Sequence, residues 1–317
     1  MLTIETVKSL VQRVIYAPSS HNTQPWRFRT SASTIDLLAD RTRALPVNDP
    51  FDRELTISCG AALMTLRVAI AALGQGARVR VLPDSGDGDW LARVEVTSDP
   101  PDAELAALAS FIEQRRTYRK AFEAREVATE IRASIATATE AEGGQLFTLV
   151  DTKRLEAGSL VAEGDRMQWD DPRWRRELAL WMHPRRQGDG LSVPTLAAPI
   201  AQAVVRTFDM GDGVAAKDQQ LLLGSPWLTV LTTAEDDTAA WLRAGQALQR
   251  ALLTGCRHGL QASYLNQPIQ VAPLRERLRS LLGTEAYPQL LMRWGHPVSA
   301  APATPRRKVD AVIEMSA

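Results

Sequence analysis

The chain has few of the residues that form cross-links or bind metals. Its 317 residues include two cysteines, Cys59 and Cys256, and both fall inside helix-like patterns that offer neither a disulfide framework nor a metal-ligand spacing. The four histidines contain no HExxH motif and no Cys–His pairing at a zinc-binding interval. We therefore expect no metal site, and a reducing cytoplasm as the compartment.

An excess of charge of one sign is also lacking. Lys plus Arg and Asp plus Glu number 37 each, so no overall field draws the protein to nucleic acid or to an anionic membrane. The first 18 residues carry Glu5 and alternate polar with apolar positions, which indicates an amphipathic helix and not a targeting segment. The most apolar run, residues 61–73, contains Arg67 and is too short to cross a bilayer. We expect no transmembrane helix.

Hydrophobic periodicity predicts a mixed helix and strand order for most of the chain. Residues 99–103, DPPDA, interrupt the pattern and separate two units, which we place at 1–102 and 103–317. Residues 151–220 show the weakest pattern and resemble an insertion. The predicted helices are 3–16, 55–73, 103 to about 115, 128–139 and 237–258, and the predicted strands are 26–30, 34–40, 77–83, 90–97, 145–150, 225–233 and 289–294.

An internal repeat supports the division into two units. Several residues recur at one constant interval, the interval from Gly60 to Gly245, without a gap. Because a helix, its glycine stop and the following strand all recur, we predict two copies of one α+β unit. The matched pairs are Gly60 with Gly245, Leu63 with Leu248, Gly74 with Gly259, and Pro83 with Pro268.

The most distinctive stretch is PSSHNTQPW, residues 18–26. Pro18 and Pro25 keep this segment out of a helix, so its hydroxyls, amides and backbone N–H groups stay available to a ligand. An ordinary turn is the alternative, since Ser and Asn are common in turns. The composition predicts a loop that holds a ligand.

A second stretch, RRTYR at residues 115–119, puts three arginines and a threonine within five positions. Guanidinium groups beside a hydroxyl match phosphate oxygens in charge and in geometry. The alternative is a solvated basic turn at the start of a helix. Neither stretch makes a binding site by itself, so we predict that the two meet in one site.

Together the two stretches resemble the flavin-binding elements of the nitroreductase family. In that family an early Arg-Arg-Ser-x-Arg element and a later Pro-Ser-Ser-x-Asn-x-Gln-Pro-Trp element come from two different subunits. Here both stand in one chain and in the reverse order, which resembles the single-chain branch close to the mycobacterial Acg proteins. The resemblance covers most of the chain. It implies a nitroreductase-like α+β fold in which two related units form an intramolecular pseudo-dimer with one site.

The resemblance also implies FMN as the cofactor and assigns its contacts by position. His21 falls at the variable position of the first motif. The loop contacts to the isoalloxazine and ribityl are assigned to Pro18, Ser19, Ser20, Asn22 and Gln24. The phosphate and pyrimidine contacts are assigned to Arg115, Arg116, Thr117 and Arg119.

The resemblance also implies cofactor contacts for two further segments. YLNQP, residues 264–268, stands where the family places the segment beside flavin N5, and Asn266 and Gln267 replace the usual Glu-Gly. In the tail, PRRK resembles the terminal basic residues that close on the phosphate, so Arg306 and Arg307 are assigned there, with a solvated tail as the alternative.

The implied activity is that of an FMN-dependent NAD(P)H oxidoreductase acting on an electron-poor small molecule, such as a nitroaromatic or a quinone. The flavin carries the chemistry, and the sequence indicates no side-chain general acid. The alternatives are a non-catalytic FMN store of the Acg type and a flavin-free interaction protein. In the insertion, the Trp- and Arg-rich residues 169–186 form either an aromatic lid over the flavin or a helix that packs its apolar face.

Overall fold

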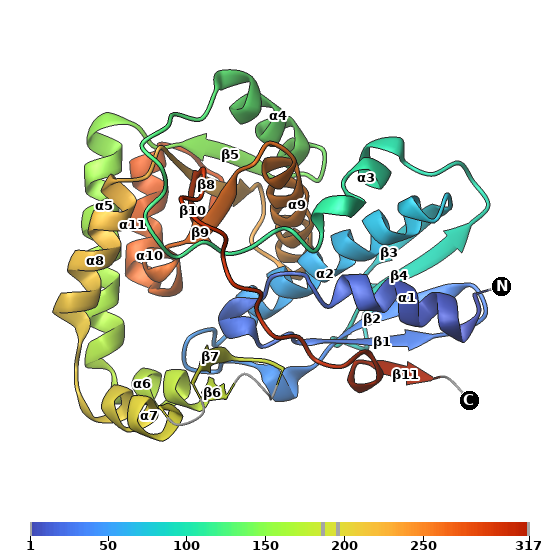
Figure 1. The fold of residues 1–317 in the computed structure, drawn as a ribbon, viewed down its shortest axis with the longest axis horizontal. Coiled ribbons are helices and arrows are strands. Elements are labelled where there is room, and N and C mark those ends of the chain that lie inside the picture. Colours follow the sequence, from blue (N-terminus) through green and yellow to red (C-terminus); the bar gives the residue numbers. More distant parts are fainter. Residues whose placement is uncertain (1, 185–187, 195–196, 316–317) are drawn as a thin grey trace.

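The computed structural model describes residues 2–184, 188–194 and 197–315. Two sheets with their helices lie side by side, and an insertion of helices covers one end of both (Figure 1). One sheet has the strand order β11-β1-β2-β4-β3, the other has the order β5-β8-β10-β9, and a small sheet pairs β6 with β7. This arrangement confirms the prediction of an α+β chain.

The first sheet forms largely where the sequence predicts it. Its consecutive strands pair antiparallel, and Phe28 on β1 pairs in parallel with Ile313 on β11 (Ile313–Met315). The end of the chain therefore returns to complete the sheet of the first unit. The elements of this unit are α1 (Ile4–Val14), β1 (Trp26–Thr30), β2 (Thr34–Ala39), α2 (Arg53–Ala72), β3 (Gly76–Val81) and β4 (Trp90–Thr97).

The second sheet follows the same plan. Asp237 caps its long helix, accepting a hydrogen bond from Ala240 N, so the helix starts one residue after the predicted position. The elements are α3 (Ala103–Ala107), α4 (Thr129–Glu140), β5 (Gln145–Thr148), β8 (Trp227–Thr233), α9 (Thr238–Arg257), β9 (Gln261–Tyr264), α10 (Gln267–Gln270), α11 (Ala272–Leu282) and β10 (Tyr287–Gly295).

The predicted helix from residue 103 to the basic stretch is wrong over most of its length. It ends at Ala107, and a short 3₁₀ turn follows at Ala109–Phe111. The basic stretch itself is extended, because Tyr118 N donates to Ala262 O at 2.9 Å and the segment takes the free edge of β9. Backbone hydrogen bonding to the sheet edge thus replaces the helix ladder.

The insertion, which the sequence left without clear pattern, is mainly helical. A cluster of buried apolar side chains, Trp169, Ala179 and Val205, packs three of its helices together. Residues 185–187, which include the last two arginines of the Trp- and Arg-rich stretch, lie outside the described residues. The elements are α5 (Asp151–Asp170), α6 (Pro172–Leu180), β6 (Met182–Pro184), β7 (Leu191–Val193), α7 (Ala198–Thr207) and α8 (Gly211–Leu223).

The two units meet where α2 and α9 cross, at Gly60 and Gly245. A Cβ atom at Gly60 would lie 2.9 Å from Gly245 Cα and against Leu242 O, and one at Gly245 would lie 2.7 Å from Gly60 Cα and against Ile57 O. Leu242 follows Ile57 at the same interval that separates the two glycines, so the contact is reciprocal, like the isologous interface of a two-fold dimer. The pseudo-dimeric arrangement predicted from the repeat is confirmed.

Helix α2 owes its apolar character to this central position. In the part of the chain that the structure describes, it is the one helix long and apolar enough to cross a membrane by length and composition. Of its most apolar window, however, 89% is buried inside the fold. The helix is longer than the apolar run 61–73, and its burial is that of a core helix.

Candidate functional site

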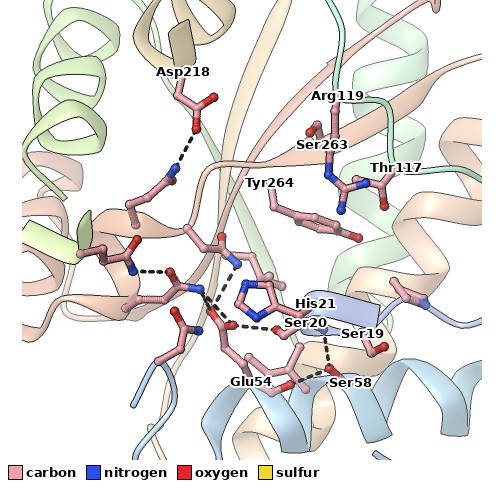
Figure 2. A pocket seen from close by; sticks show the side chains of 18 of the residues that line it. Ser19, Ser20, His21, Glu54, Ser58, Thr117, Arg119, Asp218, Ser263 and Tyr264 are labelled. Atoms are coloured by element: carbon pink, nitrogen blue, oxygen red, sulfur yellow. Dashed lines mark hydrogen bonds between the residues drawn. The ribbon is translucent and has the colours of Figure 1, made fainter. Parts of the chain in front are cut away.

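A cavity of about 310 Å³ lies where both units and the insertion meet. Its size is at the low end of the range typical of small-molecule sites. Figure 2 shows Ser19, Ser20 and His21 on one side, Glu54 and Ser58 below them, and Thr117 and Arg119 across from Asp218. The lining combines hydroxyls, carboxyls and a guanidinium with the apolar walls Ile57, Leu248, Leu290 and Val214.

The loop of the first motif presents its two serines to the cavity. Ser19 Oγ accepts from Gln24 N at 3.0 Å, and Ser20 Oγ donates to Glu54 Oε2 at 2.7 Å. His21, Asn22 and Gln24 have φ angles of 46°, 55° and 51°, in the left-handed region. Histidine and asparagine are enriched there among non-glycine residues, which is how this sequence makes so tight a turn. Pro18 lines the cavity beside the serines.

The two amides of the same motif face away from the cavity and bind the rest of the protein. Asn22 Nδ2 donates to Gly190 O and to Pro305 O, both at 3.2 Å. Gln24 Nε2 donates to Gly188 O at 2.9 Å, and its Oε1 accepts from Arg307 N at 2.9 Å. These two residues therefore fix the insertion and the tail against the loop.

Two arginines from distant segments converge behind the cavity. Arg115 is 3% exposed and donates from Nη2 to Tyr16 O at 3.0 Å, and its Nε and Nη1 are buried without a partner. Arg306 donates to Asn22 Oδ1 at 2.6 Å and to Tyr16 O at 3.4 Å, and its Nε is also buried without a partner. Burial, together with the positive charges of Arg115 and Arg116, lowers the pKa of the Arg306 guanidinium to about 9.

This basic group has no counter-charge among the residues that the structure describes. Salt bridges join most other arginines to carboxylates, but none joins Arg115, Arg116, Arg119 or Arg306 to one. Of these four side chains Arg115 is buried, Arg116 and Arg306 are half-buried, and Arg119 is exposed. A buried guanidinium such as that of Arg115 is rarely left unpaired because the desolvation cost is high. The arrangement is therefore suited to an anionic ligand.

The other predicted basic residues divide between the cavity and the scaffold. Thr117 and Arg119 line the cavity. Arg116 instead holds the segment in place, since its backbone N donates to Gln261 Oε1 at 2.7 Å and its guanidinium donates to Arg115 O at 2.9 Å. Arg307 points away from the cavity and donates to Gln24 O at 2.9 Å and to Ala311 O at 2.9 Å.

The last residue of β9, Tyr264, lines the cavity together with Asn266 and Gln267 from the segment that follows. Asn266 Oδ1 accepts from Leu291 N at 3.0 Å, which fixes the segment to β10. The Tyr264 hydroxyl is buried without a partner, and burial raises its pKa while Arg115 and Arg119 act in the opposite direction. The positive charges of Arg115 and Arg119 therefore act on this hydroxyl.

Two cavity residues had no assigned role in the sequence. Glu54, 3% exposed, accepts from Ser20 Oγ and, at 3.0 and 3.1 Å, from Gln270 Nε2. His21 has a buried Nδ1 without a partner, and burial lowers its pKa to about 4, so its imidazole is neutral at pH 7. An acidic residue in the first turn of a helix is favoured by the helix dipole, so the sequence alone did not single out Glu54 as a site residue.

The insertion closes the remaining side of the cavity. Trp169 on α5 and Trp174 on α6 pack edge to face, with ring centroids 5.5 Å apart, and both line the cavity. Trp174 Nε1 donates to Asn48 Oδ1 at 2.9 Å, which ties the insertion to the first unit. The same two tryptophans therefore pack together and line the cavity, and a role as a lid over a flavin stays a prediction.

No family model matches the sequence, but known proteins resemble the chain over almost its whole length. A Mycobacterium tuberculosis protein with the provisional name NAD(P)H nitroreductase is 35% identical over 320 residues, which cover 98% of this chain and 91% of that protein. Acg of the same organism, provisionally named in the same way, is 30% identical over 324 residues, 100% of this chain and 98% of Acg. The crystal structure of FMN-dependent NfnB from Mycobacterium smegmatis in complex with NADPH is 16% identical, with a TM-score of 0.46, over 67% of this chain and 100% of NfnB.

Proposed function

The chain belongs to the family of NAD(P)H nitroreductases that includes Acg, and from this membership we propose that it binds FMN in the cavity between its two units. We further propose that it passes electrons from NAD(P)H through this flavin to an electron-poor small molecule. The observation that carries the proposal is the pair Arg115 and Arg306, whose buried N–H groups lack partners, together with the position of Arg115 near the cavity hydroxyl of Tyr264.

The residues present fit a flavin mononucleotide. A terminal phosphate suits the unpaired N–H groups of Arg115 and Arg306 and the hydroxyl of Thr117, because charge-assisted hydrogen bonds to phosphate are strong. Ser19 and Ser20 would hold the ribityl and ring from the other unit. The site would then need both units, and Arg116, Asn22, Gln24 and Arg307 would support it from outside the cavity.

When bound, the flavin supplies the hydride and electron transfer. The chain supplies position and environment. Glu54 is fixed by Ser20 and Gln270, and His21 stays neutral, so the charges around the ligand are set before it binds. The tryptophan wall of the insertion limits the access of water, which strengthens the electrostatic interactions inside.

A second candidate function is FMN storage without turnover. The observation that favours it is the insertion, since α5, α6 and α8 all contribute lining residues and cover the cavity. A covered flavin would exchange slowly with solvent and with NAD(P)H. A flavin-free interaction protein is the third candidate, and the unpaired buried arginines argue against it.

One experiment separates the three functions. The purified protein is loaded with FMN and mixed anaerobically with excess NADH or NADPH while the flavin absorbance is recorded. A reductase loses its visible flavin band within seconds and regains it on addition of a quinone or nitroaromatic. Persistent yellow colour supports storage and overturns the proposed electron transfer. Protein that neither retains nor quenches FMN supports the flavin-free role.

A further inference from the structure

The insertion brings two carboxyl groups to the cavity, and one amide holds both of them. Asp165 on α5 and Asp218 on α8 line the cavity, and Gln267 Nε2 donates to Asp165 Oδ1 at 3.0 Å and to Asp218 Oδ2 at 2.8 Å. Figure 2 shows Asp218 with its hydrogen bond on the side of the view away from Thr117 and Arg119. We call Asp165 and Asp218 the acidic pair.

The charge of the acidic pair is partly balanced within the chain. Burial raises the pKa of Asp218, and the positive charges of Arg293 and Lys217 act in the opposite direction. Burial and the negative charge of Asp218 raise the pKa of Asp165 to about 7, against the hydrogen bond from Gln267. Charge alone therefore does not identify a ligand for this end of the cavity, and the hydrogen-bonding groups have to be considered.

Two hydrogen-bond acceptors at this end lack donors. Asp165 is 2% exposed, and its Oδ2 is buried without a partner. The Gln267 side chain is fixed in orientation, because only its amide nitrogen can donate to two carboxyl groups. Its remaining polar atom is the acceptor Oε1, which is also buried without a partner. Since a buried acceptor without a donor is costly, a ligand that brings two N–H groups is favoured here.

The cavity also has a buried donor without a partner, beside its tryptophans. Asn48 Oδ1 accepts from Trp174 Nε1 at 2.9 Å, and Asn48 Nδ2 is buried and unpaired. Trp174 packs against Trp169, which follows Asp165 by one turn of α5. Two acceptors, a donor and an aromatic wall match a flat ring with a primary carboxamide, because that group carries two N–H donors and a carbonyl acceptor. An aromatic amine lacks the acceptor, and an ester lacks the donors.

Close packing holds the two acceptors in place. Gly164, next to Asp165, lets α5 approach Gln267, since a Cβ atom at Gly164 would lie 2.8 Å from Gln267 Cβ and 3.0 Å from Gln267 C. Asn266, the other neighbour in this contact, accepts from Leu291 N at 3.0 Å and so joins the segment to β10. Buried acceptors that are fixed before binding discriminate strongly against ligands that lack the matching donors.

We propose that Asp165 and Gln267 form a subsite for the primary carboxamide of a flat aromatic ring, whose two N–H groups donate to Asp165 Oδ2 and Gln267 Oε1. The ring is either the nicotinamide of the electron donor or an aromatic amide that accepts electrons, and both carry the same group. The part of this ring in electron transfer rests on the proposed function. Binding of the carboxamide does not, because the chain alone builds the subsite.

The test compares each amide with the methyl ester of the same ring, since the ester keeps the carbonyl acceptor and loses both donors. The pairs are nicotinamide with methyl nicotinate, and 4-nitrobenzamide with methyl 4-nitrobenzoate. Binding is measured by calorimetry on the FMN-loaded protein and on the flavin-free protein at pH 8. Because the pKa of Asp165 is about 7, its carboxyl is then mostly ionised and only accepts hydrogen bonds.

We expect the amide to bind about tenfold more tightly than its ester in one or both pairs, because the ester leaves the two buried acceptors unpaired. A preference for nicotinamide alone assigns the subsite to the electron donor. A preference for 4-nitrobenzamide alone assigns it to the electron acceptor, and a preference in both pairs shows that the two share it. Equal affinities within both pairs would overturn the proposal.

The variant Asp165→Asn replaces the free acceptor with a donor. Gln267 Nε2 needs an oxygen as its partner, so the new amide presents its nitrogen where Asp165 Oδ2 stands. We expect this variant to lose the preference for the amide and to bind the ester at least as well as the parent does. Asp218→Asn is the matched comparison and should keep the preference, because it removes a charge from the same end but leaves Asp165 Oδ2 free.

The two variants also separate hydrogen bonding from charge. A preference that survives in Asp165→Asn, or one that is lost equally in both variants, contradicts the subsite. If the flavin-free protein shows the preference but binds no FMN, the proposed function fails while the subsite stands. If the protein binds FMN and shows no preference, the subsite alone fails.

Discussion

The guanidinium groups of Arg115 and Arg306 both donate to the carbonyl oxygen of Tyr16, at 3.0 and 3.4 Å. The three residues come from the second unit, the tail and the first unit, so one backbone oxygen joins all three segments. Two like charges held this close without a carboxylate require something else to balance them. An anionic ligand such as a phosphate is the balance that fits the cavity beside them.

Removing one of these arginines should weaken the binding of FMN. We expect Arg115→Ala to lower the affinity about 10- to 100-fold, which corresponds to roughly 1.5–3 kcal/mol for a lost hydrogen bond to a charged group. Fluorescence quenching of FMN measures it directly. Arg125→Ala removes an exposed arginine of the same unit and is the control. If both variants bind FMN as the parent does, Arg115 has no role in the site.

Arg306 should give the site a pH limit that Arg115 alone would not. Since the pKa of Arg306 is lowered to about 9, its charge is lost as the pH rises past that value. We therefore expect the affinity for FMN to fall between about pH 8 and 10, and the fall to disappear in Arg306→Ala, which binds FMN weakly throughout. An affinity that is flat across this range in the parent protein would count against Arg306 as a phosphate ligand.

The glycine contact between the units should tolerate no side chain. Gly60→Ala and Gly245→Ala each place a methyl group against backbone atoms of the other helix, and we expect each to lower the free energy of unfolding by about 1–3 kcal/mol. Because the two sites touch, the double variant should be non-additive. Gly213→Ala on α8, where a Cβ meets nothing within 4 Å, is the control. Urea unfolding that leaves Gly60→Ala unchanged would contradict the observed packing.

The acidic pair should lower stability at neutral pH. The pKa of Asp165 is about 7 in the folded protein against an ordinary value of 3.8, so the folded state binds more protons between these values. The free energy of unfolding then falls as the pH rises from about 4 to 7. We expect Asp165→Asn to be more stable than the parent at pH 8 and the difference to shrink towards pH 4.5. A variant that is less stable at pH 8 would show that the carboxylate is not penalised by burial.

The order of helices and strands could be predicted from the sequence because it follows from local hydrophobic periodicity and from the internal repeat. The recurrence of Gly60 at Gly245 predicted a duplicated unit, and the structure places these two glycines at the contact between the units. Most predicted strands form, but buried and more exposed positions alternate along β1 and β3, whereas β8 and β10 are buried almost throughout. The boundary between the units at residues 102 and 103 stays a proposal, and β11 shows that the end of the chain joins the sheet of the first unit.

The directions of side chains could not be predicted in the same way. Motif position assigned Arg116, Asn22, Gln24 and Arg307 to the ligand, but each of these side chains satisfies a backbone group or a neighbouring segment. The contact of Asp165 with Gln267 involves α5, whose apolar residues are spread around its circumference. The hydrophobic pattern of this helix therefore did not predict which side chains face the cavity. Tertiary packing, and not local propensity, places these groups.

The central claim is that the two units share one flavin site, and the number of FMN molecules bound per chain tests it most directly. Flavin-free protein at known concentration is titrated with FMN, and the equivalence point is read from fluorescence and from the visible spectrum. We predict one FMN per chain, with the equivalence point lost or blurred in Arg115→Ala. Two per chain would show that each unit keeps a site of its own, and none would show that the cavity does not bind the flavin.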